Sequence, residues 1–244
     1  MNTISINCDV GEGVANEHLL MPYLSSCNIA CGGHFGDVKT MDSTIAIAIE
    51  NKVLLGAHPS FPDKENFGRI VMNLASEALQ KSIESQLALF ESRLDLVGAK
   101  MNHIKAHGAL YNLIAVDVSI AKTFLKAIDK YAKSVFLYVP FNSVIARLAI
   151  EKNIKVVYEV FADRNYNADL SLVSRKQKNA LITDSVAVFK HVVHMYRHQE
   201  VNTISGKKKA IIAETFCVHG DQENALSILA YLSEHLNKEG ISIG

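Results

Sequence analysis

The chain has 244 residues, of which 49% are hydrophobic and 20% are charged, an ordinary balance for a globular protein with a substantial core. Lysine plus arginine and aspartate plus glutamate both number 25, so the formal net charge is zero. This balance argues against a protein that binds nucleic acid or an anionic membrane, and we expect neither partner.

The first residues lack the basic segment and the long apolar stretch of a signal peptide, and no apolar run is long enough to span a bilayer. The four cysteines, Cys8, Cys27, Cys31 and Cys217, form no Cys-x-x-Cys pair, and their number is low for a disulfide framework. We therefore expect a cytoplasmic protein with reduced thiols.

Short apolar runs predict strands at residues 3–9, 27–31, 53–57, 102–105, 134–139, 155–161 and 209–216. Helical periodicity predicts helices at residues 17–24, 38–51, 76–98, 117–133, 143–153, 184–198 and 222–238. Asp37 and Ser76 stand where the N-caps of two of these helices are expected.

Predicted strands and helices alternate along the chain, with no linker or change in composition between them. Such alternation predicts an α/β protein with a parallel sheet covered by helices. About seven units in a single catalytic domain, residues 1–244, favour a closed or nearly closed (β/α) barrel over an open sheet, although periodicity alone does not choose between them.

Polar clusters follow most of the predicted strands. They are Asp9 with Glu12, His34 with Asp37, His58 with Asp63, Lys105 with His107, Asp163 with Arg164, and His219 with Asp221. The carboxyl ends of the strands of a parallel barrel open on one face, which holds the active site. We therefore expect these side chains to share one pocket.

The residue types suggest roles within this pocket. Asp9 and Glu12, on a tight glycine turn, suit general-base or metal-binding work. Lys105 and His107 alternate along a strand and should point to the same side. Glu159 lies within an apolar strand and must be partnered or functional, because an unpaired buried carboxylate is costly.

Other polar residues have simpler interpretations. Asp37 suits a helix N-cap as well as a catalytic acid, and Cys31 is expected to pack as a small apolar side chain. The remaining histidines lie away from strand ends and are expected to be structural: His103, His191, His194, His198 and His235.

Histidines and carboxylates from separate strand ends can also bind a divalent metal, which stays possible here. No local ligand motif supports it apart from the spacing of His103 and His107. The phosphate-binding loop, the dinucleotide fingerprint and the nucleophile elbow are all absent from the sequence.

The strand-end motifs resemble those of the LamB/YcsF family, in order and over nearly the whole chain. They lie at residues 7–13, 28–37, 56–63, 67–69, 107–112, 159–166 and 219–221. The resemblance implies a seven-stranded β/α barrel of the glycoside hydrolase/deacetylase type. It also implies the A subunit of an ATP-hydrolysing 5-oxoprolinase, which with subunits B and C opens 5-oxoproline to L-glutamate.

The resemblance and the residue chemistry together assign the site. The expected catalytic residues are Asp9, Glu12, His34, His58, His107 and Glu159. The expected substrate-binding residues are Arg69, Lys105, Tyr111, Asp163, Arg164, His219 and Asp221. Within these sets, Asp9 or His34 would be the base, and His58 and His107 would be acids or oxyanion donors. Lys105, Arg69 and Arg164 would hold anions. ATP would be a co-substrate, bound by this chain or by one of its partners.

The chain departs from the family pattern at several positions. Ala106 replaces a proline, which removes a bias of Lys105 towards extended backbone. Ile70 replaces an arginine, Ser174 a proline and Asn179 a glycine. We expect these changes to affect substrate and partner contacts more than the fold.

Two other functions fit the same residues. The first is a metal-dependent deacetylase or carbohydrate hydrolase that acts alone and is inactivated by chelation. The second is a binding subunit that presents substrate to a partner without chemistry of its own.

Overall fold

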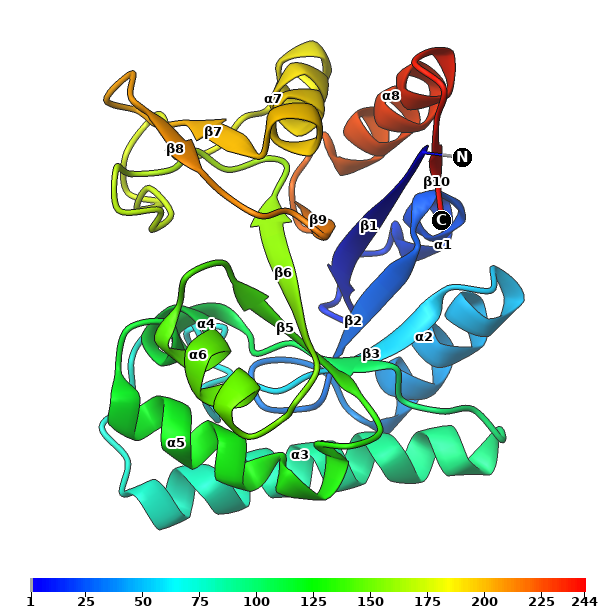
Figure 1. Ribbon diagram of the computed structural model, residues 1–244. Coiled ribbons are helices and arrows are strands. Elements are labelled where there is room, and N and C mark those ends of the chain that lie inside the picture. Colours follow the sequence, from blue (N-terminus) through cyan, green and yellow to red (C-terminus); the bar gives the residue numbers. More distant parts are fainter. Residues whose placement is uncertain (1) are drawn as a thin grey trace.

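The computed structural model describes residues 2–244 and contains a closed barrel of parallel strands surrounded by helices (Figure 1). The barrel strands, in spatial order, are β1 (Asn2–Val10), β2 (Ser26–Ala30), β3 (Leu54–His58), β4 (His103–Ile104), β5 (Phe136–Pro140), β6 (Val156–Phe161) and β9 (Thr215–His219). β9 pairs with both β6 and β1, which closes the ring. The predicted seven-stranded α/β barrel is therefore confirmed.

The C-terminal part of the chain differs from the prediction. The predicted strand at 209–216 is wrong, because the barrel strand is β9 and begins at Thr215. Residues 208–210 form β8 (Lys208–Ala210), which is antiparallel to β7 (Glu200–Asn202) in a hairpin beside α7 (Figure 1). Its lysines stay exposed in this hairpin, whereas a barrel strand would bury them. A further strand, β10 (Ile241–Ile243), pairs in parallel with the start of β1.

Helices cover the outside of the barrel. They are α1 (Glu17–Leu20), α2 (Val38–Glu50), α3 (Ser76–Leu96), α4 (Gly108–Ile114), α5 (Val118–Ala127), α6 (Val144–Glu151), α7 (Ser185–His198) and α8 (Ala225–Lys238). Figure 1 shows α3 and α5 packed together on one side and α7 and α8 on the other. Within residues 2–244 no single helix is long and apolar enough to cross a membrane, and the bent pair α4 and α5 meets that test by length and composition only.

The structure confirms one of the two predicted helix N-caps and corrects the other. Asp37 Oδ1 accepts a hydrogen bond from Thr40 N at 2.8 Å, which confirms Asp37 as the N-cap of α2. Ser76 is wrong as a cap, because Ala75 holds that position without a side-chain bond. The helix predicted at 117–133 stops at Ala127 and continues as a 3-10 turn, Asp129–Tyr131.

β4 is shorter than predicted, but its pairing with the β3 segment continues past Ile104. Lys105 N donates to Ala57 O at 3.0 Å, and His107 N donates to Pro59 O at 2.9 Å. This alternation directs the side chains of Lys105 and His107 to the same cavity. The extended backbone is thus held by hydrogen bonds even though Ala106 lacks the proline ring.

Candidate active site

A cavity of about 870 Å³ opens at the carboxyl ends of the barrel strands. Eleven of the thirteen predicted site residues line it: Asp9, Glu12, His58, Arg69, Lys105, His107, Tyr111, Glu159, Arg164, His219 and Asp221. His34 and Asp163 contact members of this set from behind. The strand-end residues therefore converge as expected, whereas Asp63 accepts bonds from Asn66 in a surface turn.

Lys105 lies at the floor of the cavity and is 2% exposed. Its Nζ is 2.9 Å from Asp9 Oδ1, 2.8 Å from Glu159 Oε1 and 3.1 Å from Cys217 Sγ. Burial alone would lower the pKa of Lys105, but Asp9 and the other anionic partners raise it well above its usual value. Lys105 is therefore a buried, permanently charged cation.

Asp9 contacts both Lys105 and His58, so it links the buried lysine to the histidines of the site. Burial would raise its pKa, but His58 and Lys105 hold it well below the usual range. Asn28 Nδ2 donates to Asp9 Oδ1 at 2.8 Å and also to Asn7 Oδ1 at 2.8 Å. These contacts fix the Asp9 carboxylate in its ionised form.

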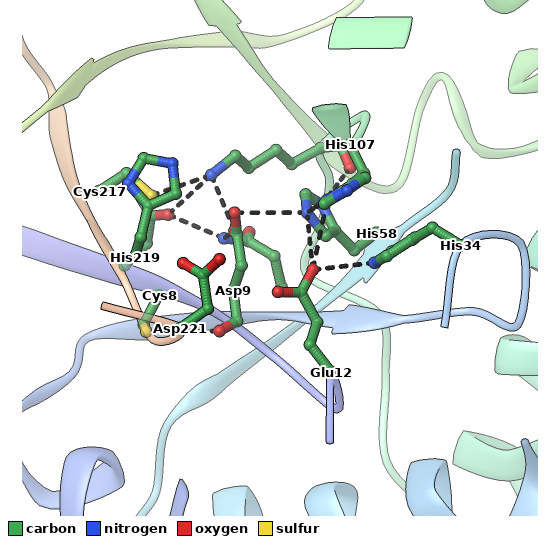
Figure 2. Close-up of polar contacts among 12 residues, drawn as sticks. Cys8, Asp9, Glu12, His34, His58, His107, Cys217, His219 and Asp221 are labelled. Atoms are coloured by element: carbon green, nitrogen blue, oxygen red, sulfur yellow. Dashed lines mark hydrogen bonds and ion pairs between the residues drawn. The ribbon is translucent and has the colours of Figure 1, made fainter. Parts of the chain in front are cut away.

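Glu12 is surrounded by three imidazoles (Figure 2). Its Oε1 lies 2.8 Å from His34 Nε2, 3.2 Å from His107 Nδ1 and 3.9 Å from His58 Nε2. Burial would raise the pKa of Glu12, but hydrogen bonds with His107 and His34 lower it well below its usual value. The ligand atoms of all four residues lie within 4.8 Å of one another, so the group could hold a metal ion.

The imidazoles of His34 and His107 pack tightly, and their burial disfavours the charged form. The rings of His34 and His107 are stacked with centroids 3.6 Å apart. Burial lowers the pKa of His34 to about 4 and lowers the pKa of His107 as well.

Two backbone carbonyls fix the orientation of the rings. His58 Nδ1 donates to Lys105 O at 2.8 Å, and His107 Nε2 donates to Phe67 O at 2.9 Å. The loop carrying Phe67 can approach because Gly68 has φ +61°, and a Cβ there would lie 2.9 Å from the His34 Cβ. The Phe67-Gly68-Arg69 motif thus positions the histidines.

The cavity rim carries charged side chains. Arg69 pairs with Asp221, and Asp163 accepts from His219 Nδ1 at 2.9 Å. Arg164, expected to hold an anion, donates to Ala180 O at 3.3 Å and to the Val173 carbonyl at 2.6 Å. Arg164 therefore stabilises the loop of residues 165–182, part of which covers the cavity.

Glu159 and Tyr111 keep unused hydrogen-bonding capacity. Both line the cavity; Glu159 Oε1 is ion-paired with Lys105 Nζ at 2.8 Å, and the Tyr111 hydroxyl is directed at the Glu159 carboxylate. Burial and the nearby Glu159 charge raise the pKa of Tyr111 well above its usual value, so its hydroxyl stays protonated. The pair offers a ligand one acceptor and one donor.

Some residues of the site were not predicted. Asn7, Asn28 and Cys217 contact the Lys105–Asp9 pair, and residues 169–176 line the cavity. The spacing of Asn7 and Asp9 along β1 was an available signal, because residues two apart on a strand share a face. Burial raises the pKa of the Cys217 thiol well above its usual value, so it is not a ready nucleophile.

Comparison with known proteins decides the family, because residues 4–244 match LamB/YcsF. The chain belongs to the LamB/YcsF family. It is 40% identical to a protein of Bacillus cereus (strain 03BB102) that is named as the A subunit of 5-oxoprolinase, over 100% of this chain and 98% of that protein. It is also 40% identical to the protein of the same name from Haemophilus influenzae (strain PittEE), over 100% of this chain and 99% of that one.

The barrel of this LamB/YcsF chain also matches a solved structure. The lactam utilization protein from Thermus thermophilus superimposes with a TM-score of 0.92 and 28% identity, covering 99% of this chain and 98% of that one. The predicted membership of the family and its barrel fold are therefore confirmed over the length of the chain.

Proposed function

We propose that this chain is the A subunit of an ATP-dependent 5-oxoprolinase, a hydrolase that opens the lactam of 5-oxoproline to L-glutamate with partner subunits B and C. The observation that carries the proposal is the convergence of Asp9, His58, His107 and Lys105 on one cavity, in a chain whose full-length relatives are named for this activity. ATP as co-substrate is consistent with the predicted cytoplasmic location.

A five-membered lactam resists water because its amide is resonance-stabilised. Transfer of the γ-phosphoryl group of ATP to the amide oxygen forms an O–P bond, releases ADP and makes the ring carbon electrophilic. Water then adds to that carbon, the C–N bond breaks and the nitrogen takes a proton. A second water hydrolyses the acyl phosphate to glutamate and phosphate. The site must therefore supply a base, a proton donor and a fixed cation.

The chain's side chains suit these tasks. Asp9 is ionised and lines the cavity, which favours it over His34 as the base for water. His58 and His107 present a ring nitrogen each beside Asp9 and Glu12, where they can act on the lactam oxygen or nitrogen. Lys105 supplies positive charge at the floor.

Substrate binding is assigned to the free polar groups of the cavity. Glu159 can accept the lactam N–H, and Tyr111 can donate to a ligand oxygen. Arg69, at the rim, is the proposed partner for a carboxylate or phosphate, with Asp221 as its counter-ion in the absence of ligand. The cavity volume lies in the usual range for small-molecule sites.

The test is an assay of glutamate release from 5-oxoproline and ATP, with and without subunits B and C. We expect glutamate only in the complete mixture. Absence of glutamate under every combination would contradict the proposal.

The buried Glu12 and histidine group supports a second candidate, a metal-dependent hydrolase that acts alone. Chelation separates the two. The second candidate predicts hydrolysis without ATP or partners that stops on addition of a chelator.

A further inference from the structure

The ring nitrogens of His58 and His107 that face the cavity lie opposite each other. His58 Nδ1 and His107 Nε2 each contact a carbonyl oxygen, which can only accept, so each of these nitrogens carries the hydrogen. The other two ring nitrogens, His58 Nε2 and His107 Nδ1, are 3.0 Å apart. They are the two ring atoms left to bind a ligand on the cavity side.

Carboxylate oxygens converge on the same point. Glu12 Oε1 lies 3.2 Å from His107 Nδ1 and 3.9 Å from His58 Nε2, and Asp9 Oδ2 lies 3.4 Å from His58 Nε2. Within residues 2–244, Glu12 makes no ion pair with a lysine or arginine. Two ring nitrogens and one oxygen of Glu12 thus face a common space, with Asp9, the ion-pair partner of Lys105, beside His58.

The distances between these atoms suit a metal ion. Bonds of 2.0–2.2 Å in a tetrahedral site place neighbouring ligand atoms roughly 3.3–3.6 Å apart. The observed separations of 3.0, 3.2 and 3.9 Å lie around these values. Imidazole and carboxylate together are the usual ligands of zinc and similar divalent ions.

The surroundings also match those of metal-binding histidines. Such histidines usually donate their second ring N–H to a carbonyl or carboxylate, as His58 and His107 do here. His34 plays a different part. Its Nε2 donates to Glu12 Oε1, and its Nδ1 has no partner within residues 2–244. If His34 bound metal through Nε2, its Nδ1–H would be buried without an acceptor, which is costly.

We propose that His58 Nε2, His107 Nδ1 and Glu12 form a binding site for one first-row divalent metal ion such as Zn²⁺, with His34 as a positioning residue for Glu12. All three ligands line the cavity and His34 does not, so the fourth position of the ion would be open to a ligand on the cavity side. An ion there would supply Lewis acidity. With an ion bound, these ring nitrogens would be its ligands in place of the acid–base groups of the lactam reaction proposed above.

The test uses the untagged chain, stripped with a chelator and titrated with Zn²⁺ alone by calorimetry, and with Co²⁺ by visible absorption. We expect one equivalent of Zn²⁺ per chain and Co²⁺ bands in the visible range typical of a low-symmetry site. His58→Gln and His107→Gln should each lose stoichiometric binding. His34→Gln should keep the stoichiometry and weaken affinity by roughly 10- to 100-fold, as for other groups that orient a ligand.

His219→Gln is the matched control, because His219 lies in the same cavity but is bonded to Asp163. It should bind Zn²⁺ like the original chain. Circular dichroism of each stripped variant checks folding, and a variant that does not fold is replaced by Glu12→Gln, for which loss of binding is also expected. The proposal is overturned if the folded chain binds no ion, if a proton alone lies between the rings by nitrogen NMR, or if the His58 and His107 variants bind normally.

Discussion

His58 Nε2 lies 3.0 Å from His107 Nδ1, and both nitrogens face the carboxylate of Glu12. The two histidines come from the ends of neighbouring strands, β3 and β4, so the pairing of those strands sets this distance. The geometry of this candidate site therefore depends on the register of the strands as much as on the identity of the residues.

His107→Ala should lower glutamate formation by ~10²-fold or more, because it removes a group to which we assign acid–base work on the lactam. Activity is measured with ATP and subunits B and C. His198→Ala is the control, since His198 is exposed on α7, away from the cavity. Full activity of the His107 variant would remove His107 from the proposed mechanism.

Arg69→Ala should raise the KM for 5-oxoproline or for ATP by about ten- to hundredfold with a smaller change in kcat, because a hydrogen bond to a charged group contributes ~1.5–3 kcal/mol. The substrate whose KM rises identifies the anion that Arg69 holds. Arg93→Ala, which removes a surface pair with Asp42, is the control. An unchanged KM for both substrates contradicts the assignment.

Lys105→Met should destabilise the fold by about 3–5 kcal/mol, because it leaves Asp9 and Glu159 buried without their cation. Urea unfolding at pH 7 measures the loss. Adding Asp9→Asn to this variant should recover part of the lost free energy of unfolding, because it removes one uncompensated charge. Equal stability of the single and double variants would show that the buried pair is not coupled.

The free energy of unfolding should fall as the pH drops below about 6.5. Burial lowers the pKa of His103 to about 3 and that of His191 to about 4 in the folded chain. As the pH falls, the unfolded chain therefore protonates these two histidines before the folded chain does. Each group then contributes a slope of up to ~1.4 kcal/mol per pH unit in that window. Urea unfolding between pH 7 and 5 measures this slope.

His103→Gln should make that slope shallower, since one titrating group is removed. His103 lies inside the barrel, where its Nε2 donates to Asn28 Oδ1 at 2.7 Å. An unchanged slope would show that His103 takes up no additional proton on unfolding.

Gly56→Ala should destabilise the barrel by ~1–3 kcal/mol, the usual cost of overpacking. A Cβ on Gly56 would lie 2.0 Å from His103 Nε2, so the ring and its bond to Asn28 must move. Adding His103→Ala relieves the clash, so the double variant should lose less stability than the sum of the two single changes, a coupling that a double-mutant cycle in urea measures. Additive effects of the two changes would contradict this contact.

The sequence predicted most of the barrel because each strand is a short apolar run followed by polar residues. It failed at 209–216, where three lysines (207–209) adjoin an apolar segment and the chain forms a hairpin before β9. It also missed β10, whose three residues pair only with β1, a partner more than 230 residues away in the chain. Local patterns carry no information about such pairing.

The sequence by itself determined which residues reach the active-site face, because the carboxyl ends of parallel strands all open there. Only the tertiary structure decided how these residues pair. Lys105 is buried between Asp9 and Glu159. Arg164 donates to a carbonyl of the loop of residues 165–182, and His34 contacts Glu12 from outside the cavity lining. The physical reason is that ion pairs and ring orientations depend on distances across the barrel, which are set by strand register and by backbone carbonyls far away in the chain.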